Sequence, residues 1–308
     1  MKISMLLATI ILGVMPTFGS QAADALELTP VTNDIYAIVG SLENRTKENL
    51  GNNATFGFVV TSEGVVLIDS GGTYKGAMKI HEVIKRVTDK PVVAVINTGG
   101  QDHRWLGNGY FKNRGAKLIA SKQAVEDQKA RNRDQFFILG NLVGVQGLEG
   151  TDPVYADTLF DKDMRFTVGE VVFEVHHAGP AHTPGDSFVW LPQQKVMFAG
   201  DIVFTERMLG ILEYSNSKSW LNAYQAMASY EPKYLIPGHG HPCDLNKANA
   251  DTRDYLLFLR QAVADFMENG GDISEIRKID QSRFKYLVNF DLLAGRNAQK
   301  VYSELEWE

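Results

Sequence analysis

Cysteine is almost absent from this sequence, with Cys243 the single example in 308 residues. An intramolecular disulfide is therefore excluded, and the fold has to be stabilised by its core. Clusters of lysine and arginine are also missing and the formal net charge is −6, which argues against nucleic acid as a partner. The longest apolar run, residues 5–15, is shorter than the roughly 20 residues that span a membrane.

That apolar run has the pattern of an export signal. Lys2 precedes it as a minimal basic region, and Ser20-Gln21-Ala22 follows it as the small-x-small site that a signal peptidase cuts. The sequence therefore predicts a signal peptide over residues 1–22. The mature protein, residues 23–308, is expected to be soluble in the periplasm, with no membrane contact after cleavage.

The full sequence is 44% hydrophobic, and its mature part alternates two kinds of pattern. Short β-branched runs predict strands, and apolar residues at helical spacing predict helices. Strands are expected at 35–39, 56–60, 65–68, 91–96, 117–120, 164–168, 171–176, 187–191, 195–198 and 234–236. Helices are expected at 75–88, 107–114, 122–131 and 218–230, and from residue 252 onward. This order predicts an α/β fold in which two sheets pack face to face with helices outside.

We interpret residues 23–308 as a single domain with a C-terminal helical extension over about 252–308. The glycine-rich segment 136–151 is less regular and could form a flap over a site or a plain surface loop. The sequence gives no indication of the oligomeric state.

The loop 97–108 follows the buried strand 91–96 and is unusually rich in polar groups. It holds Gln101, Asp102, His103 and Arg104 side by side, after two glycines. Loops at the carboxyl ends of strands are where α/β proteins place their chemistry. This composition favours a functional site over a packed turn.

Three further polar residues occupy equivalent positions. His182, Asp201 and His239 each follow an apolar strand in a loop with glycine or proline, as His103 does. Such loops converge on one edge of a sheet sandwich. Imidazole nitrogen and carboxylate oxygen are ligands that zinc accepts while keeping one position open for water.

Several short motifs, in this order, resemble those of the metallo-β-lactamase superfamily. They are Val66-Leu67-Ile68-Asp69-Ser70-Gly71, Asn97-Thr98, Gly107-Asn108, His182-Thr183-Pro184-Gly185-Asp186, Phe198-Ala199-Gly200-Asp201 and Pro237-Gly238-His239-Gly240. The resemblance covers about residues 35–244 and implies an αββα sandwich with a metal site at one edge. It implies that His182 binds one metal, that Asp201 bridges two, and that His239 binds the second. Asp69 is expected to orient a ligand imidazole through the ring nitrogen that does not bind the metal.

The loop 97–108 departs from the family pattern. The family usually has His-x-His-x-Asp-His where this chain has Gly-Gly-Gln-Asp-His-Arg. A gapless alignment leaves Gly99, Gln101, His103 and Arg104 at the ligand positions, and a guanidinium repels cations. A one-residue slide would instead let Asp102 and His103 replace the usual Asp-His pair.

Both registers keep His103 near the metal. We therefore expect one zinc ion rather than two, held by His103, Asp201 and His239. His182 is expected close by, with Gln101 as a possible weak ligand.

Zinc at such a site lowers the pKa of bound water toward about 7, which would allow attack on an amide, ester or lactone carbon. Asp102 is the candidate proton carrier, or it pairs with Arg104. Arg104 could bind a substrate carboxylate. Trp105 could contact the substrate or belong to the core.

Three functional hypotheses follow for a small-molecule partner. The first is an exported zinc hydrolase, with β-lactams as the leading substrate. The second is a mononuclear iron oxygenase, because two histidines and one carboxylate suit that chemistry. The third is a non-catalytic binding protein with a degenerate metal site. His176 and His177 are expected to be structural, His241 could replace a missing ligand, and Cys243 is expected to be a buried thiol.

Overall fold

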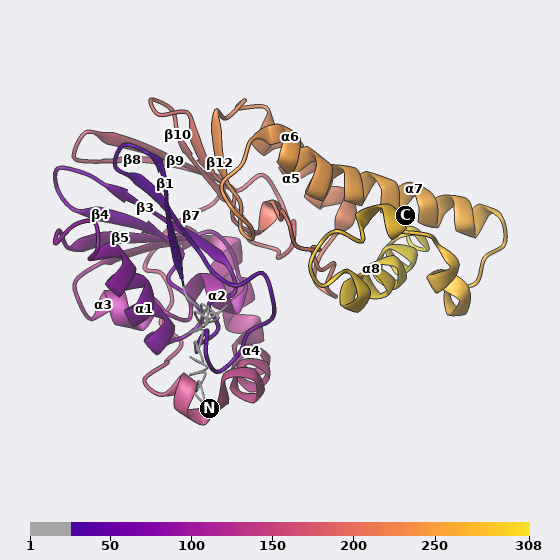
Figure 1. Ribbon diagram of the computed structural model, residues 1–308, viewed down its shortest axis with the longest axis horizontal. Coiled ribbons are helices and arrows are strands. Elements are labelled where there is room, and N and C mark those ends of the chain that lie inside the picture. Colours follow the sequence, from indigo (N-terminus) through magenta and orange to yellow (C-terminus); the bar gives the residue numbers. More distant parts are fainter. Residues whose placement is uncertain (1–25) are drawn as a thin grey trace, which may run out of the picture.

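The computed structural model describes residues 26–308, so the expected signal peptide at 1–22 lies outside the described residues. The described chain forms two sheets with helices on their outer faces (Figure 1). The first sheet has seven strands, in the order β1 (Glu27–Thr32), β2 (Ile35–Val39), β3 (Thr55–Val60), β4 (Val65–Ile68), β5 (Val92–Asn97), β6 (Lys117–Ser121) and β7 (Thr158–Phe160). The α/β sandwich expected from the sequence is confirmed.

The first sheet changes direction at β4. Strands β1 to β4 pair antiparallel, whereas β4 to β7 pair parallel. Residues alternate along β4 because successive side chains point to opposite faces. Val65 and Leu67 pack against the outer helices, while Val66 and Ile68 pack against the second sheet. Both faces are therefore buried, as the continuous apolar run predicts.

The outer face of the first sheet is covered by α1 (Tyr74–Ile84), α3 (Asn108–Lys112) and α4 (Lys122–Leu148). The second sheet has the order β12-β11-β10-β9-β8. Its strands are β8 (Asp163–Val168), β9 (Val171–His176), β10 (Phe188–Leu191), β11 (Val196–Phe198) and β12 (Tyr234–Ile236). All neighbours pair antiparallel except β11 and β12, which are parallel.

The outer side of the second sheet packs against α5 (Ser217–Ala228) and the helical C-terminal part of the chain. That part contains α6 (Leu245–Ala248), a π-helical turn (Asn249–Arg253), α7 (Asp254–Glu268) and α8 (Phe290–Leu305). Two 3₁₀ turns, Ile273–Lys278 and Ser282–Phe284, lie between α7 and α8. Among the residues described, none of the helices is both long and apolar enough to cross a bilayer.

Three local expectations are corrected. The segment 136–151 is not a plain loop, because α4 continues through it to Leu148, and its Ile138 lines the cavity described below. The helix is bent at Gly144, whose φ of 75° and ψ of 166° are not helical. Strands β1 and β7 were not predicted, because Pro30 interrupts the first and the second is only three residues long.

The loops that leave the carboxyl ends of β5, β11 and β12 carry the polar residues noted in the sequence. The first forms α2 (Asp102–Trp105), the second forms a 3₁₀ turn (Gly200–Ile202), and the third contains His239. Strands β11 and β12 are parallel, so their ends meet at one edge. This edge brings the candidate ligands together.

Candidate functional site

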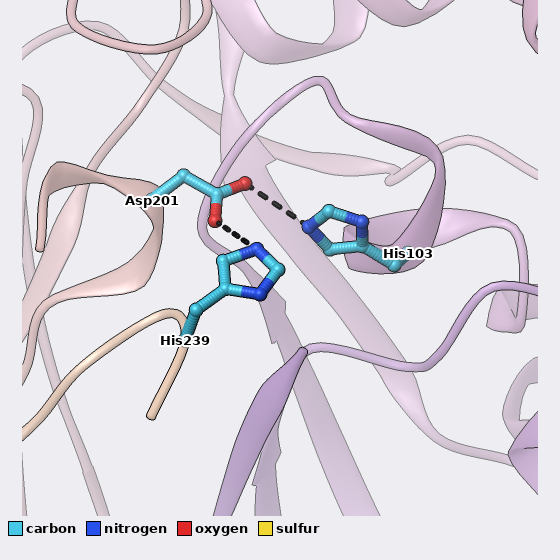
Figure 2. Close-up of side chains that lie close together, drawn as sticks. All are labelled: His103, Asp201 and His239. Atoms are coloured by element: carbon cyan, nitrogen blue, oxygen red, sulfur yellow. Dashed lines mark hydrogen bonds and ion pairs between the residues drawn. The ribbon is translucent and has the colours of Figure 1, made fainter. Parts of the chain in front are cut away.

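Three side chains, His103, Asp201 and His239, converge at this edge and point toward one another (Figure 2). His103 Nε2 lies 3.2 Å from Asp201 Oδ2, and His239 Nε2 lies 3.3 Å from Asp201 Oδ1. One ligand atom from each residue fits within a mutual distance of 4.8 Å, and all three residues are buried. Among the described residues this is the one such group of three or more histidine, cysteine, aspartate or glutamate side chains.

The ring orientation of His239 is fixed by the backbone. Its Nδ1 lies 2.8 Å from the carbonyl oxygen of Asn53. A carbonyl oxygen only accepts hydrogen bonds, so Nδ1 carries the proton and Nε2 presents its lone pair to the cluster. Burial lowers the pKa of His239 well below its usual range, so the ring is a neutral donor. This is how metal-binding histidines are commonly held.

His182 is held in the same way but stands apart from the close group of three. Its Nδ1 donates to the carbonyl oxygen of Gly210 at 3.0 Å, and its ring packs against Phe204 and Trp220. Burial lowers the pKa of His182 to about 4. The neutral Nε2 is thus available beside the cluster.

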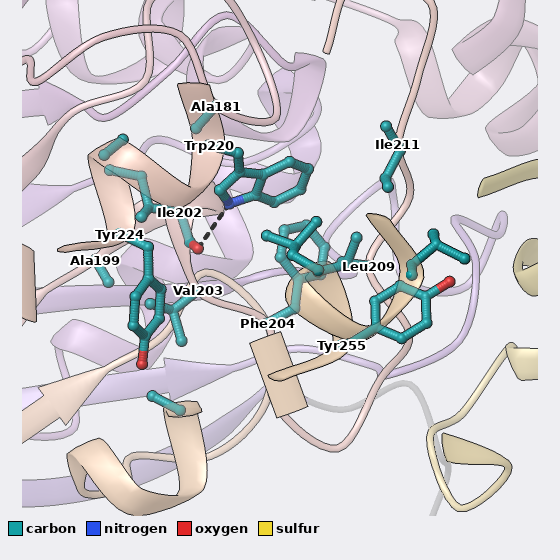
Figure 3. Close-up of a cluster of buried hydrophobic side chains, with 14 of the residues drawn as sticks. Ala181, Ala199, Ile202, Val203, Phe204, Leu209, Ile211, Trp220, Tyr224 and Tyr255 are labelled. Atoms are coloured by element: carbon teal, nitrogen blue, oxygen red, sulfur yellow. Dashed lines mark hydrogen bonds between the residues drawn. The ribbon is translucent and has the colours of Figure 1, made fainter. Parts of the chain in front are cut away.

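Asp201 is the charged centre of the group. Burial by itself would raise the pKa of this carboxyl, but the Arg104 guanidinium and then His103 hold it well below its usual range. The short turn that carries Asp201 rests on an apolar cluster that includes Ile202, Val203 and Trp220 (Figure 3). Trp220 Nε1 donates to the carbonyl oxygen of Ile202 at 2.9 Å, which anchors the residue next to Asp201.

Arg104 is completely buried behind Asp201. Its five N–H groups all have acceptors: both carboxylate oxygens of Asp201, one oxygen of Asp69, and the carbonyl oxygens of Thr55 and Gly238. The hypothesis that Arg104 binds a substrate carboxylate is therefore contradicted, because no donor is left for a ligand. The residue instead positions Asp201.

Asp102 also has a different partner from the one suggested by the sequence. It pairs with Arg45, whose Nη2 lies 2.5 Å from Asp102 Oδ1, and not with Arg104. Burial opposes ionisation, but Arg45 and His103 hold the pKa of Asp102 well below its usual range. Arg45 Nη2 also lies 3.0 Å from His103 Nδ1. Asp102 and Arg45 together thus fix the far side of the His103 ring.

Asp69 accepts hydrogen bonds from Thr98 N at 2.7 Å and from Arg104 Nη1 at 2.9 Å. The expectation that it orients a ligand imidazole is wrong, because Arg104 occupies that place. Burial raises the pKa of Asp69 in spite of the neighbouring guanidinium. Asp69 therefore supports the cluster through Arg104 and Asp201.

Gly99 and Gln101, two further ligand positions of the gapless alignment, are surrounded by protein groups. A side chain at Gly99 would collide with Asp186 and Thr183. Gln101 Oε1 accepts a hydrogen bond from the Tyr214 hydroxyl at 2.9 Å.

Trp105 is fully buried and donates to Gln135, so it belongs to the core.

The remaining expectations concern residues outside the group. His241 bonds Glu206 at 2.7 Å, and His176 and His177 bond Asp163 and the carbonyl oxygen of Asp186. Burial raises the pKa of the half-buried Cys243 thiol to about 12. None of these four side chains belongs to the three-residue group.

The donor set fits one cation. Tetrahedral zinc with bonds of about 2.0–2.1 Å places neighbouring ligand atoms roughly 3.3–3.4 Å apart. Each histidine Nε2 lies at about this distance from one oxygen of Asp201, His103 at 3.2 Å from Oδ2 and His239 at 3.3 Å from Oδ1, and one ligand atom from each residue lies within 4.8 Å of the others. Next to these donors lies a cavity of about 390 Å³ that is lined by His103, His182 and His239. A small molecule could therefore reach a cation held by the cluster.

The sequence did not indicate three other residues of this cavity. Arg45, Arg207 and Tyr214 lie in stretches without a recognisable motif. Only the chain path brings them to the cluster, so no sequence signal could have identified them.

A family model described as "Metallo-beta-lactamase superfamily" matches residues 51–239. "Metallo-beta-lactamase type 2" of Elizabethkingia meningoseptica is 30% identical over 191 residues, which cover 59% of this chain and 67% of the relative. "Metallo-beta-lactamase IND-1" of Chryseobacterium indologenes is 26% identical over 231 residues, 73% of this chain and 86% of the relative.

Solved structures show the same fold. The metallo-beta-lactamase from Pontibacter korlensis matches with a TM-score of 0.57 and 24% identity, covering 73% of this chain and 95% of its own. The stereoselective inverting sec-alkylsulfatase Pisa1 from Pseudomonas sp. matches with a TM-score of 0.72 and 21% identity. That match covers 90% of this chain and 50% of the other.

Proposed function

The chain belongs to the metallo-β-lactamase superfamily, and on that premise we propose that it is an exported, zinc-dependent hydrolase of a small carbonyl substrate. The observation that carries the proposal is the buried group of His103, Asp201 and His239. Relatives named as metallo-β-lactamases at 26–30% identity make a β-lactam the first substrate to test, followed by lactones and esters.

The proposed site holds one zinc ion rather than two. His103, Asp201 and His239 would bind it, with His182 and Gln101 at the side of the same cavity. Arg104 argues against a second cation because it is a buried positive charge bonded to Asp201.

Bound zinc would supply Lewis acidity toward a substrate oxygen and acidify a water molecule. The protein would contribute orientation. The carbonyl oxygens of Asn53 and Gly210 accept from Nδ1 of His239 and His182 and so leave the Nε2 of each ring unprotonated, and Arg104 keeps Asp201 ionised. Asp102 is tied to Arg45 and to the His103 ring, so we assign it a positioning role rather than that of a proton carrier.

The first test is the metal content of the protein purified without added metal. We expect one zinc per chain, and loss of zinc in His103→Ala and His239→Ala. His81→Ala, on the outer helix α1, is the matched control and should keep the metal. Hydrolysis of a chromogenic cephalosporin, a lactone and an aryl ester should stop when a chelator removes the ion.

The same measurement can overturn the proposal. Two zinc ions per chain would contradict the single site, and a protein without metal would favour the non-catalytic binding protein. Export is tested separately, because N-terminal sequencing of the periplasmic fraction should find a mature chain that begins near Ala23.

One observation favours a second candidate. The group consists of two histidines and one carboxylate, the set that non-haem iron oxygenases use. Iron in place of zinc, together with oxygen consumption, would support an oxygenase.

A further inference from the structure

The charged side chains that line the cavity beside the metal cluster are all arginines. Arg45, Arg207 and Arg296 line it, and no aspartate or glutamate does so among the described residues. The chain as a whole is acidic, with a formal net charge of −6. The all-arginine set of charged lining residues is therefore a local feature and not a consequence of composition, although one of the three, Arg45, is already paired with Asp102.

Arg207 is the most unusual of the three. It is only 7% exposed, and no carboxylate lies within 4.0 Å of its guanidinium in residues 26–308. Its Nη1 donates to the carbonyl oxygen of Glu43 at 2.8 Å, but its buried Nε has no partner. Burial, and then the charge of Arg45, lower the pKa of Arg207 to about 10. Burying a cation without an anion is costly, so such a residue is expected where a ligand brings the anion.

Two neighbouring residues of the cavity also have buried polar atoms without a hydrogen-bond partner. The Nε of Arg45 and the Oδ1 of Asn53 are also buried without a partner. Together with Arg207 Nε, they are three of the seven such side-chain atoms found in the described part of the chain. Two of them, the Nε atoms of Arg45 and Arg207, are N–H donors without an acceptor, as expected beside an anionic ligand, whereas Asn53 Oδ1 is an acceptor that an anion does not satisfy.

Arg45 contacts the cluster directly, and Arg207 is connected to it through the Asn53 carbonyl. Arg45 Nη2 lies 3.0 Å from His103 Nδ1. The carbonyl oxygen of Asn53 accepts from His239 Nδ1 at 2.8 Å and lies 3.5 Å from Arg207 Nη1. An anionic group between the two guanidiniums would thus lie next to the metal ligands.

The other walls of the cavity are apolar. Ile138 comes from α4, Met208 and Leu212 come from the segment after β11, and Leu292 and Leu293 come from the first turn of α8. A volume of about 390 Å³ is sufficient for a small organic molecule. The cavity therefore offers an anion site and an apolar surface to one ligand.

We propose that the substrate is a small amphiphilic organic anion whose carboxylate, sulfate or phosphate group binds between Arg207 and Arg45. Its apolar body lies against Ile138, Met208 and the leucines of α8, and its reacting bond lies over the cluster. The assignment as a substrate rests on the proposed hydrolase function. The arginines place the substrate, and Arg104 does not contact it.

The experiment measures binding to the full-length mature protein, as purified, by calorimetry. The probes are octanoate, octyl sulfate and octyl phosphate, with octan-1-ol as the neutral molecule of equal chain length. At least one anion should bind about tenfold more tightly than octan-1-ol, and its Kd should rise with salt. The ranking of the three anions identifies the charged group.

Arg207→Gln should weaken the binding of that anion about tenfold or more and leave the binding of octan-1-ol unchanged. Arg133→Gln is the matched control, because it removes the same charge from an exposed position on α4. If Arg207→Gln does not fold, Arg296→Gln at the exposed rim is measured instead. It should still weaken the binding of the anion, and the Kd of this variant should rise less steeply with salt than that of the parent protein. Equal affinities for anion and alcohol, or equal losses in Arg207→Gln and Arg133→Gln, would overturn the proposal.

Failure of this inference can be separated from failure of the proposed function. Metal content and hydrolysis of a neutral aryl ester do not depend on the anion site. If the protein binds zinc and hydrolyses the ester but shows no preference for anions over octan-1-ol, only the anion site is overturned. Anion binding that requires Arg207 in a protein without metal would support the anion site and overturn the hydrolase.

Discussion

At the scale of single residues, the site is dominated by one buried ion pair. Arg104 bonds both oxygens of Asp201 and one oxygen of Asp69, and all three side chains are at most 1% exposed. Two negative charges and one positive charge thus meet in the interior with little water to screen them. The arginine keeps the carboxylate of the candidate metal cluster ionised.

Replacing Arg104 should therefore strongly reduce the stability of the protein. We expect Arg104→Met to lower the free energy of unfolding of the metal-free protein by about 3–5 kcal/mol, because it leaves two carboxylates buried without a counter-charge. Arg104→Lys should recover only part of this loss, because an ammonium cannot reproduce the planar fork. Denaturant unfolding measures both variants, with exposed Arg133→Met as control. A loss below 1 kcal/mol in Arg104→Met would contradict the assigned role.

At the scale of elements, periodicity predicted most strands and helices but not the length of α4. The glycines at 140, 144 and 147 made residues 136–151 look irregular, yet Leu139 and Val143 are buried against Trp105 and Leu106. Packing against the core thus overrides the low helix propensity of glycine. The irregularity is confined to Gly144, where the backbone adopts a conformation that glycine alone adopts readily.

Alanine substitutions can distinguish the glycine at the bend, Gly144, from Gly140, which lies in the regular part of the helix. Gly144→Ala should destabilise the protein by about 1–3 kcal/mol, because its φ of 75° and ψ of 166° strain a residue with a Cβ. No steric clash contributes, since the nearest atom to the added Cβ would be Lys47 Cε at 3.5 Å. Gly140→Ala, on the same helix, should be close to neutral, because the gain in helix propensity is offset by a contact of 3.1 Å between the added Cβ and Leu148 Cδ1, the end of a side chain that can move aside. Thermal unfolding of the two variants checks this, and equal melting temperatures would show that the bend is not strained.

At the scale of the whole molecule, the C-terminal helices are connected to the site. Asn297 of α8 is buried, accepts from Ile211 N at 2.8 Å and donates to the carbonyl oxygen of Leu209 at 2.8 Å. Gly210, between them, accepts the hydrogen bond that orients His182. Helix α8 therefore holds the segment that holds His182, and it also supplies one wall of the cavity.

Breaking that connection should affect both stability and metal binding. Asn297→Leu leaves the buried N–H of Ile211 and the carbonyl of Leu209 unpaired, which costs about 1–3 kcal/mol for each unsatisfied group. We expect a lower melting temperature together with weaker zinc affinity, because the Gly210 carbonyl loses its support. Gln299→Ala, exposed on the same helix, is the control. Lower stability with unchanged zinc affinity would show that the helix only packs on the core.

The sequence by itself determined the layers of the fold, most of the elements, and the identity of His103, Asp201 and His239 as neighbours. The layers and elements follow from local pattern, because apolar alternation sets which face is buried and a loop at a strand's carboxyl end must emerge at the site edge. The choice of these three side chains rested also on the resemblance to the metallo-β-lactamase superfamily. Only the tertiary structure decided the partners of the charges. Arg104 turned inward to Asp201 and Asp69, Asp102 paired with Arg45 from 57 residues away, and Arg207 was left facing the cavity. Charge pairing depends on distance and burial in space, and a linear sequence carries neither.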